Sequence, residues 1–215
     1  MTQTIDFRFE ALFLLLVAAS LVSLVTVIVM AIAKRGRTAM KVLKTLGIVW
    51  GVYLAVVLIV AAATPQRVIP VGHDLCWDEM CFAVTNVKTA AQLDSSTAPV
   101  RADGTFYVVT VRVSSRARGR AQSERGLRAQ LWSQQHTYPI SEKGQAAWDA
   151  GHPESSALTT RVAPGQAIFS DQVFDVPAQS SDFGVLLTNG FTPGYFVIGE
   201  CPLFHKPTIL RISPE

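Results

Sequence analysis

The stretch TFYVVTVRV, residues Thr105–Val113, decides the fold of the larger part of this chain. Successive side chains of an extended backbone point to opposite faces, so every second residue from Tyr107 to Val113 contributes to one apolar face. The opposite face turns polar at Thr110 and Arg112. One apolar face and one polar face are typical of a half-buried β-strand, which is what this stretch predicts.

Six further short runs of apolar and β-branched residues are separated by Gly, Pro, Asp and Ser. Together with Thr105–Val113 they predict seven strands without a long helical period, which favours an all-β, immunoglobulin-like antiparallel sandwich over an α/β fold. Ser141–Gly151 predicts one short helix with Ser141 as its N-cap, and Lys88–Gly104 predicts a surface loop. The six runs are Cys81–Val87, Leu127–Ser133, Ala167–Val176, Gly184–Thr188, Tyr195–Gly199 and Thr208–Ile212.

Two apolar runs precede this part of the chain. Ala11–Ala33 has 23 residues without an ionisable side chain, and at the rise of an α-helix it spans about 34 Å, enough to cross a hydrocarbon core. Thr45–Ala63 has 19 residues and no charge. Both runs are apolar on every face, whereas a helix on a soluble core would show a polar stripe. They predict an N-terminal transmembrane α-helical hairpin.

The segment between the runs, Lys34–Lys44, contains five basic residues and no acidic one. Short cationic loops stay in the cytoplasm, so both termini are expected on the extracytoplasmic side of the cytoplasmic (inner) membrane. The chain has a net charge of +3, but the part after Ala63 sums to −1. The basic balance therefore reports membrane topology, and nucleic acid is excluded as a partner.

These features predict a domain order. Residues 1–10 form a short outward segment, 11–63 the hairpin with its cytoplasmic loop 34–44, 64–71 a linker, and 72–215 the sandwich. The first run is too long for a signal peptide and lacks a basic start. The string from Met40 to Ala63 resembles a cleavable signal read from an internal start. A retained hairpin is favoured, and either alternative places the C-terminal part outside.

Gly47 and Gly51 form a G-x-x-x-G spacing in the second run, and Ala19 with Ser23 offers small residues in the first. Small residues at this spacing let helix backbones approach closely in lipid. Packing of the two helices within one chain is favoured over a dimer contact, because the short connection already holds the helices together. The lipid bilayer is therefore an expected partner.

Cys76 and Cys81 bracket the sequence CWDEMC. Their Cα atoms would lie about 17 Å apart in an extended chain, but a disulfide requires about 4.4–6.8 Å, so the residues between them must turn back. An extracytoplasmic compartment is oxidising, which favours a disulfide that fixes a local turn. Cys201 remains as the odd thiol, either buried or paired between molecules.

The same segment leaves an alternative open, a metal- or redox-linked extracytoplasmic sensor that uses the Cys76–Cys81 turn. Thiol oxidoreductases use Cys-x-x-Cys in an α/β context, which is absent here. No paired Cys-x-x-Cys or His-x-x-x-His spacing is present either, so neither a metal nor a cofactor is predicted. The donor residues of this segment are His73, Asp74, Cys76, Asp78, Glu79 and Cys81.

Arg116, Arg118 and Arg120 recur at every second position in SSRARGRAQSERG. An extended backbone would align their guanidinium groups for contact with anionic lipid head groups or an acidic envelope polymer. The alternative is a solvated hairpin turn. No Gly-x-Ser-x-Gly motif accompanies the isolated histidines His136, His152 and His205, so no catalytic residue is predicted and the protein is not expected to be an enzyme.

Several sequence motifs resemble those of a known family. They are TFYVVTVRV, a later Tyr-Pro, Pro164-Gly165, and Phe174-Asp175-Val176-Pro177. Over residues 72–212 the chain resembles a bacterial membrane-anchored family of immunoglobulin-like, telokin-like domains of unknown function, a fold shared by secreted immunoprotective antigens. The resemblance implies an exported module, and it brings no catalytic residues. The stretch SSRARGR replaces the family's Asn-rich turn. The expected function is interaction with a protein or an anionic polymer of the cell envelope.

Overall fold

The computed structural model describes residues 7–94, 98–133, 136–177, 182–188, 196–198 and 206–212. They belong to two compact units. The helical unit contains residues 4–66 and 191–206, and the sandwich unit contains residues 67–190 and 207–215. Cys201 and His205 lie outside the described residues, as do residues 1–6 of the predicted N-terminal segment.

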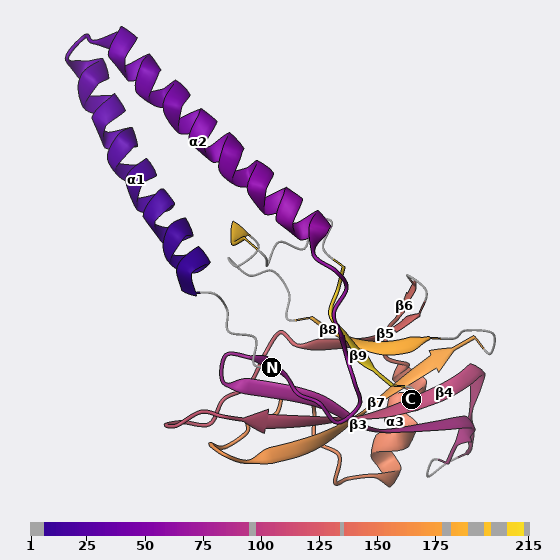
Figure 1. The fold of residues 1–215 in the computed structure, drawn as a ribbon. Coiled ribbons are helices and arrows are strands. Elements are labelled where there is room, and N and C mark those ends of the chain that lie inside the picture. The colour runs from indigo at the N-terminus through magenta and orange to yellow at the C-terminus, as the bar shows by residue number, and fades with distance from the viewer. Residues whose placement is uncertain are drawn as a thin grey trace. The chain divides into compact units, whose positions relative to one another are not determined.

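The helical unit is an antiparallel pair of helices (Figure 1). α1 spans Phe7–Ile32 and α2 spans Gly36–Ala63, and both are long and apolar enough to cross a membrane. The predicted loop 34–44 is wrong in extent, because α2 already begins at Gly36. Lys and Arg are good helix formers and no proline interrupts this segment, so its basic side chains extend the helix instead of ending it.

Aromatic side chains form much of the contact between α1 and α2. The indole Nε1 of Trp50 donates to Ser20 Oγ at 2.9 Å. The ring of Phe13 stacks on Tyr53 with centroids 6.3 Å apart. Tyr53 is buried, and its hydroxyl donates to the carbonyl oxygen of Phe196, from the second segment of the helical unit, at 2.8 Å. Packing of this pair therefore depends on large side chains.

The favoured prediction, packing of α1 against α2 through small residues within one chain, is wrong. Gly47 and Gly51 are exposed, and no atom outside α2 lies within 4 Å of the position that a Cβ would take at either glycine. Ala19 is also exposed, and Ser23 is half-buried. The rings of Trp50 and Tyr53 contact the ring of Phe13 in α1 instead.

The sandwich unit consists of two sheets and one helix (Figure 1), which confirms the predicted β-sandwich. One sheet has the order β1-β9-β8-β5-β6 and the other β2-β3-β4-β7. All neighbouring strands are antiparallel except β1 and β9. The elements are β1 Val68–Ile69, β2 Leu75–Trp77, β3 Met80–Leu93, β4 Val100–Ser115, β5 Arg128–Ser133, β6 His136–Tyr138, α3 Glu142–Gly151, β7 Ala167–Val176, β8 Phe183–Thr188 and β9 Ile209–Arg211.

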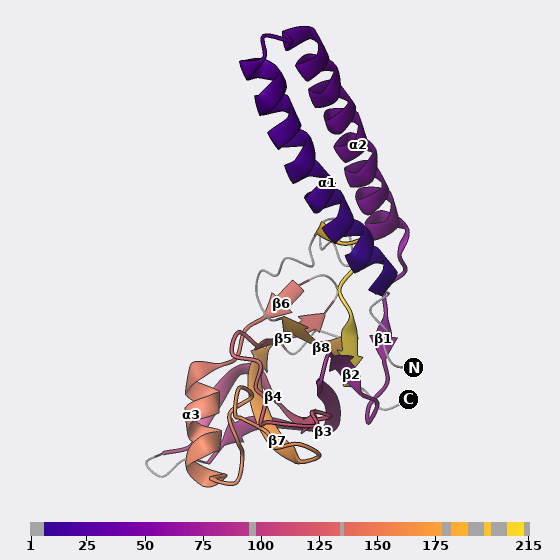
Figure 2. The same cartoon turned by 90° about the vertical axis from the view of Figure 1, so that its left-hand side faces the viewer.

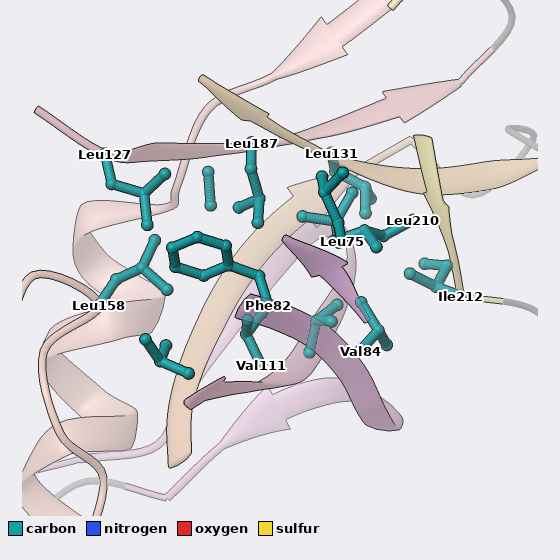
Figure 3. Close-up of a cluster of buried hydrophobic side chains, with 14 of the residues drawn as sticks. Leu75, Phe82, Val84, Val111, Leu127, Leu131, Leu158, Leu187, Leu210 and Ile212 are labelled. Atoms are coloured by element: carbon teal, nitrogen blue, oxygen red, sulfur yellow. The ribbon is translucent and has the colours of Figure 1, made fainter. Parts of the chain in front are cut away.

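The main hydrophobic core lies between the two sheets (Figure 3). Phe82 and Val111 reach it from the four-stranded sheet, and both are fully buried. Leu131, Leu187 and Leu210 reach it from the five-stranded sheet. The alternate residues of Thr105–Val113 enter this core as predicted, since Val109, Val111 and Val113 all belong to it.

A second, smaller core lies on the outer face of the four-stranded sheet. α3 lies on this side of the sheet (Figure 2). Phe106 and Val108 of β4 pack with Ala147 of α3. Gly144 lets the helix approach closely, because a Cβ there would lie 2.8 Å from Val173 Cγ1. Ser141 caps α3 as predicted, accepting from the Gly144 amide at 3.3 Å. β4 is therefore buried on both faces at one end.

The predicted surface loop Lys88–Gly104 is wrong. β3 continues to Leu93, and β4 already begins at Val100. Two register shifts in β3, between Val84 and Asn86 and between Ala90 and Gln92, keep the long strand paired. Leu93, Val100 and nearby alanines pack into the second core, which supplies burial that local composition does not reveal.

Strand boundaries agree best for β5, β7, β8 and β9, whereas the two longest strands, β3 and β4, extend well beyond their predicted ends. β7 is predicted residue for residue, and β5, β8 and β9 differ from prediction by one residue at one or both ends. β1, β2 and β6 were missed, and β1 lies inside the predicted linker 64–71. The described part of the predicted strand 195–199, residues 196–198, is not a strand.

β7 forms one edge of the four-stranded sheet, and Gln145 of α3 contacts this edge. The side-chain amide of Gln145 donates to the carbonyl oxygen of Asp171 at 2.9 Å and accepts from the backbone N–H of Val173 at 2.9 Å. One side chain thus makes the donor and acceptor contacts that a neighbouring strand would make.

Candidate functional site

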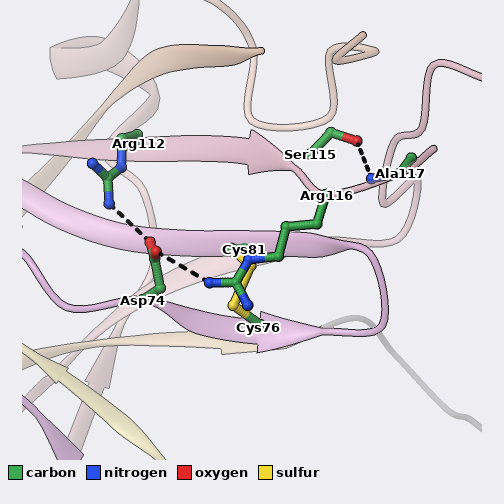
Figure 4. The surroundings of a disulfide bond; sticks show 7 residues. All are labelled: Asp74, Cys76, Cys81, Arg112, Ser115, Arg116 and Ala117. Carbon is green, nitrogen blue, oxygen red and sulfur yellow. Dashed lines mark hydrogen bonds and ion pairs between the residues drawn. A yellow bond between two sulfur atoms is a disulfide. The ribbon is translucent and has the colours of Figure 1, made fainter. Parts of the chain in front are cut away.

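β2 and β3 form a tight hairpin closed by a disulfide (Figure 4). Cys76 lies directly opposite Cys81, with the two Cα atoms 4.0 Å apart. Asp78 has φ +47° in the turn, a conformation that Asp tolerates better than most residues. The chain between the cysteines therefore turns back as predicted. We call residues 76–81 the disulfide hairpin.

Asp74 lies beside the disulfide hairpin and binds two arginines (Figure 4). Its carboxylate is 2.9 Å from Nη2 of Arg112 and 3.8 Å from Nη2 of Arg116. These side chains are between a quarter and a half exposed, so each pair contributes at most about 1 kcal/mol to stability. Arg116 is therefore already paired with a carboxylate.

The turn of the disulfide hairpin contacts the segment that follows β4. The backbone N–H of Arg116 donates to the carbonyl oxygen of Glu79 at 2.7 Å. The side-chain amide of Gln122 donates to Oε2 of Glu79 at 2.9 Å. Within the segment, Ser115 Oγ accepts from the Ala117 N–H at 3.3 Å. The disulfide hairpin thus positions the chain from Arg116 to Gln122.

The three predicted arginines do not form one row. The chain bends at residues 118–120, so the period-two alignment is wrong. Arg116 turns to Asp74, and Arg118 is exposed to solvent. Arg120 instead lines a cavity of about 500 Å³ with Arg125 and Arg161. The other lining residues of this arginine cavity are Ala121, Gln122 and Ser123.

Two of the three cavity arginines were missed by sequence reasoning. Arg125 lies in the quoted arginine-rich stretch but outside its period-two pattern. Arg161 comes from a distant segment, which pairs with the first through two backbone hydrogen bonds. The Gln122 N–H donates to the Val162 carbonyl oxygen at 3.0 Å, and the Val162 N–H donates to the Gln122 carbonyl oxygen at 2.8 Å. This pairing brings Arg161 to the cavity.

The lining of the arginine cavity has a positive charge. No acidic side chain lines it. Among the residues that the structure describes, the ion pairs involve Arg112, Arg116 and Lys143, and none involves a cavity arginine. Three guanidinium groups around one polar opening favour binding of an anion.

A second cavity, of about 440 Å³, lies where β4 begins and β7 ends. The carboxylate of Asp175 accepts from the backbone N–H groups of Asp103 and Gly104 at 2.9 and 3.0 Å. Lys143 is 2.8 Å from Asp103 and 3.5 Å from Asp175, and its hydrogen bond to Asp103 raises the pKa of the ammonium group. One ammonium group faces two carboxylates here, so this cavity has a net negative charge and differs from the arginine cavity. The Phe174–Pro177 motif therefore has a structural role at this end of the sheet.

The donors of the alternative metal site are engaged elsewhere in the described structure. The disulfide consumes both thiols, and Asp74 is ion-paired. Glu79 accepts from Gln122. Metal ions bind thiolates and not disulfides, so a metal would require a reduced hairpin with different contacts.

We expect a Cys76→Ser/Cys81→Ser double variant to lose about 2 kcal/mol of unfolding free energy, because a disulfide that closes so short a loop removes little entropy from the unfolded chain. Urea denaturation of the full chain in detergent micelles, followed by tryptophan fluorescence, measures this loss. The wild type in reducing buffer serves as a control and should show the same loss. A loss above about 4 kcal/mol would mean that the disulfide holds the whole sandwich together.

No protein-family model and no curated protein matches the sequence. The structural neighbours are uncharacterised β-sandwich proteins and a secreted protein. A conserved hypothetical protein from Bacillus anthracis is 15% identical, with a TM-score of 0.46, over 57% of this chain and 92% of that one. An uncharacterised β-sandwich protein from Clostridium difficile is 8% identical, with a TM-score of 0.42, over 70% and 96%. A secreted protein from Mycobacterium tuberculosis is 15% identical, with a TM-score of 0.40, over 69% and 99%.

Proposed function

We propose that α1 and α2 anchor the protein in the cytoplasmic membrane and that the sandwich is displayed on the extracytoplasmic side as an interaction module. The observation that carries the proposal is the pair of apolar helices joined by a basic connection. The basic residues Arg37, Lys41 and Lys44 lie near the start of α2, close to the turn between the helices. Positive charges next to a short turn keep it in the cytoplasm, so the chain after α2 lies outside.

The disulfide supports the same topology. Disulfides persist in oxidising compartments and are rare in the cytosol. Cys81 is fully buried, and Cys76 is half-buried, so the bond is partly shielded from reductants. The proposal includes an immunoglobulin-like classification of the sandwich, supported by its two largely antiparallel sheets over one shared core.

We expect a peptide tag fused after Glu215 to be degraded by protease added to intact spheroplasts. A tag inserted between Lys34 and Gly36 should be protected until the membrane is broken. Immunoblotting against each tag measures both results. The two tagged proteins control for each other, because leaky cells would expose both tags. A C-terminal tag that stays protected would overturn the topology and, with it, the proposed display.

The partner class that we propose is an anionic component of the cell envelope, either a polymer or an acidic protein surface. The arginine cavity supports this role, because its positive charge has no carboxylate partner within the described residues. Nothing in the proposal requires catalysis.

One observation favours the second candidate, redox-linked sensing. Glu79, inside the disulfide hairpin, contacts Arg116 and Gln122. Opening of the disulfide would therefore change the contacts of the chain from Arg116 to Gln122. Thiol labelling of the protein from cells grown with and without a permeable reductant tests this candidate. Reversible opening of Cys76–Cys81 at oxidant levels that cells experience would support it, and a bond that stays closed would exclude it.

A further inference from the structure

We propose that Arg120, Arg125 and Arg161 form a binding site for a phosphate group carried by a water-soluble polyanion. The inference rests on the proposed function, because it names the ligand chemistry of the displayed module. It replaces the row of Arg116, Arg118 and Arg120 expected from sequence with a set that converges in three dimensions.

The site is assembled from two chain segments that are fixed to each other. Arg120 and Arg125 flank Gln122, whose backbone makes a reciprocal pair of hydrogen bonds with Val162. Arg161 is the neighbour of Val162, and Val162 is buried in the main core. The three arginines are therefore attached to the folded sandwich through Gln122 and Val162. The backbone of the site is therefore fixed before binding, and binding has to order only the three exposed side chains.

The disulfide hairpin adds a further restraint. Oε2 of Glu79 accepts a hydrogen bond from the side-chain amide of Gln122 at 2.9 Å. The Glu79 carboxylate is therefore bonded to a lining residue of the cavity. The contact also ties Gln122 to the turn between Cys76 and Cys81. The cross-linked hairpin thus supports one wall of the arginine cavity from outside.

The lining favours phosphate as the ligand group. Guanidinium groups donate paired N–H bonds that match the oxygens of phosphate, and three of them exceed what one carboxylate can accept. Ser123 and Gln122 add a hydroxyl and an amide. A volume of about 500 Å³ admits a phosphate together with part of the chain that carries it.

The lining also favours a water-soluble carrier over a lipid. Ala121 is the one apolar residue of the lining, and no large apolar side chain contributes to it. Stable attachment to a lipid surface combines basic residues with apolar side chains that enter the acyl region. The arginine cavity has the basic residues but no large apolar side chain.

The test measures binding of fluorescently labelled short-chain polyphosphate to the full chain in neutral-lipid nanodiscs, by fluorescence anisotropy. We expect Arg125→Gln and Arg161→Gln each to weaken binding about tenfold, the loss of one charge-assisted hydrogen-bonding group. Arg118→Gln is the matched control. It removes the same charge from the same exposed surface without touching the cavity, and it should change affinity less than twofold. Circular dichroism checks that each variant is folded.

Each outcome decides the proposal. Losses confined to the cavity variants support the site. An equal loss for Arg118→Gln means diffuse attraction to a basic surface and overturns it, as does absence of binding by the wild type. Co-flotation of the nanodisc-held protein with phosphatidylglycerol vesicles, sensitive to Arg161→Gln and without polyphosphate binding, would overturn the water-soluble carrier. The tag assay tests topology independently, so failure of the display and failure of the site are distinguishable.

Discussion

Replacement of Phe82 by alanine is expected to lower the free energy of unfolding by about 3–5 kcal/mol, the usual cost of removing a buried phenyl ring. Phe82 is fully buried in the core between the two sheets (Figure 3). Its ring centroid lies 5.3 Å from that of Trp77. The variant would leave a cavity that the paired strands of β3 and β4 cannot close, because their register is fixed over many residues. Urea denaturation of the full chain in detergent, followed by tryptophan fluorescence, measures the change.

Phe169 offers a matched control for this prediction. It lies in β7, which pairs with the same strand β4, but its side chain is 52% exposed. Phe169→Ala removes the same atoms without opening a buried cavity, so we expect a loss below about 1 kcal/mol. Similar losses for the two variants would mean that the core between the sheets does not dominate stability.

Gly104→Ala is expected to destabilise the sandwich by about 3 kcal/mol, near the upper end of overpacking effects. A Cβ at this position would lie in steric conflict with the carbonyl group of Val176 and 2.9 Å from the Cα of Pro177. These are backbone atoms, so no side-chain rotation relieves the conflict. The strand ends would have to separate, which would also strain the hydrogen bond from the Gly104 N–H to Asp175.

Gly119→Ala is the corresponding control. No atom lies within 4 Å of the position that its Cβ would take, so the change in unfolding free energy should stay within about 0.5 kcal/mol. Denaturation under the conditions used for Phe82→Ala compares the two glycine variants. A stable Gly104→Ala variant would show that β4 and β7 can separate at this end without cost.

The sequence predicted the centre of β4 and the whole of β7 because their burial pattern is local. Val109, Val111 and Val113 alternate toward the core, and β7 shows a comparable pattern together with a Pro-Gly turn before it. β1, β2 and β6 have two or three residues each, too few to display a period. β2 and β6 exist because each pairs with a longer strand next to it in the chain, and β1 pairs with β9 near the opposite end of the sequence.

The errors in the helical unit and near α3 have a related cause. A run of basic residues looks like a loop, but Lys and Arg favour a helix once an apolar helix follows. Lys88–Gly104 contains turn-forming residues, yet its apolar positions are covered by α3, which comes more than thirty residues later in the chain. Burial by a distant element cannot be read from local composition.

The sequence predicted part of the candidate site. The arginine-rich stretch after β4 was recognised, and the Cys76–Cys81 disulfide was predicted from spacing and expected compartment. The grouping of arginines was wrong, because it assumed an extended backbone where the chain bends. Arg161 joins the cavity through the pairing of Val162 with Gln122. These two segments are distant in sequence, so no local sequence pattern predicts the contact.

The contact of Gln145 with the edge of β7 affects how readily copies of the protein aggregate. Unpaired strand edges template the addition of foreign strands, which leads to aggregation. Gln145 occupies the Asp171 carbonyl and the Val173 amide at once, so an incoming strand would have to displace it before pairing there. Gln145 does not act alone, because the Ser155 hydroxyl accepts from the Asp171 N–H and the Ser141 N–H donates to the Val173 carbonyl oxygen. Together these contacts keep the edge closed to edge-to-edge association, even where neighbouring molecules are crowded on one surface.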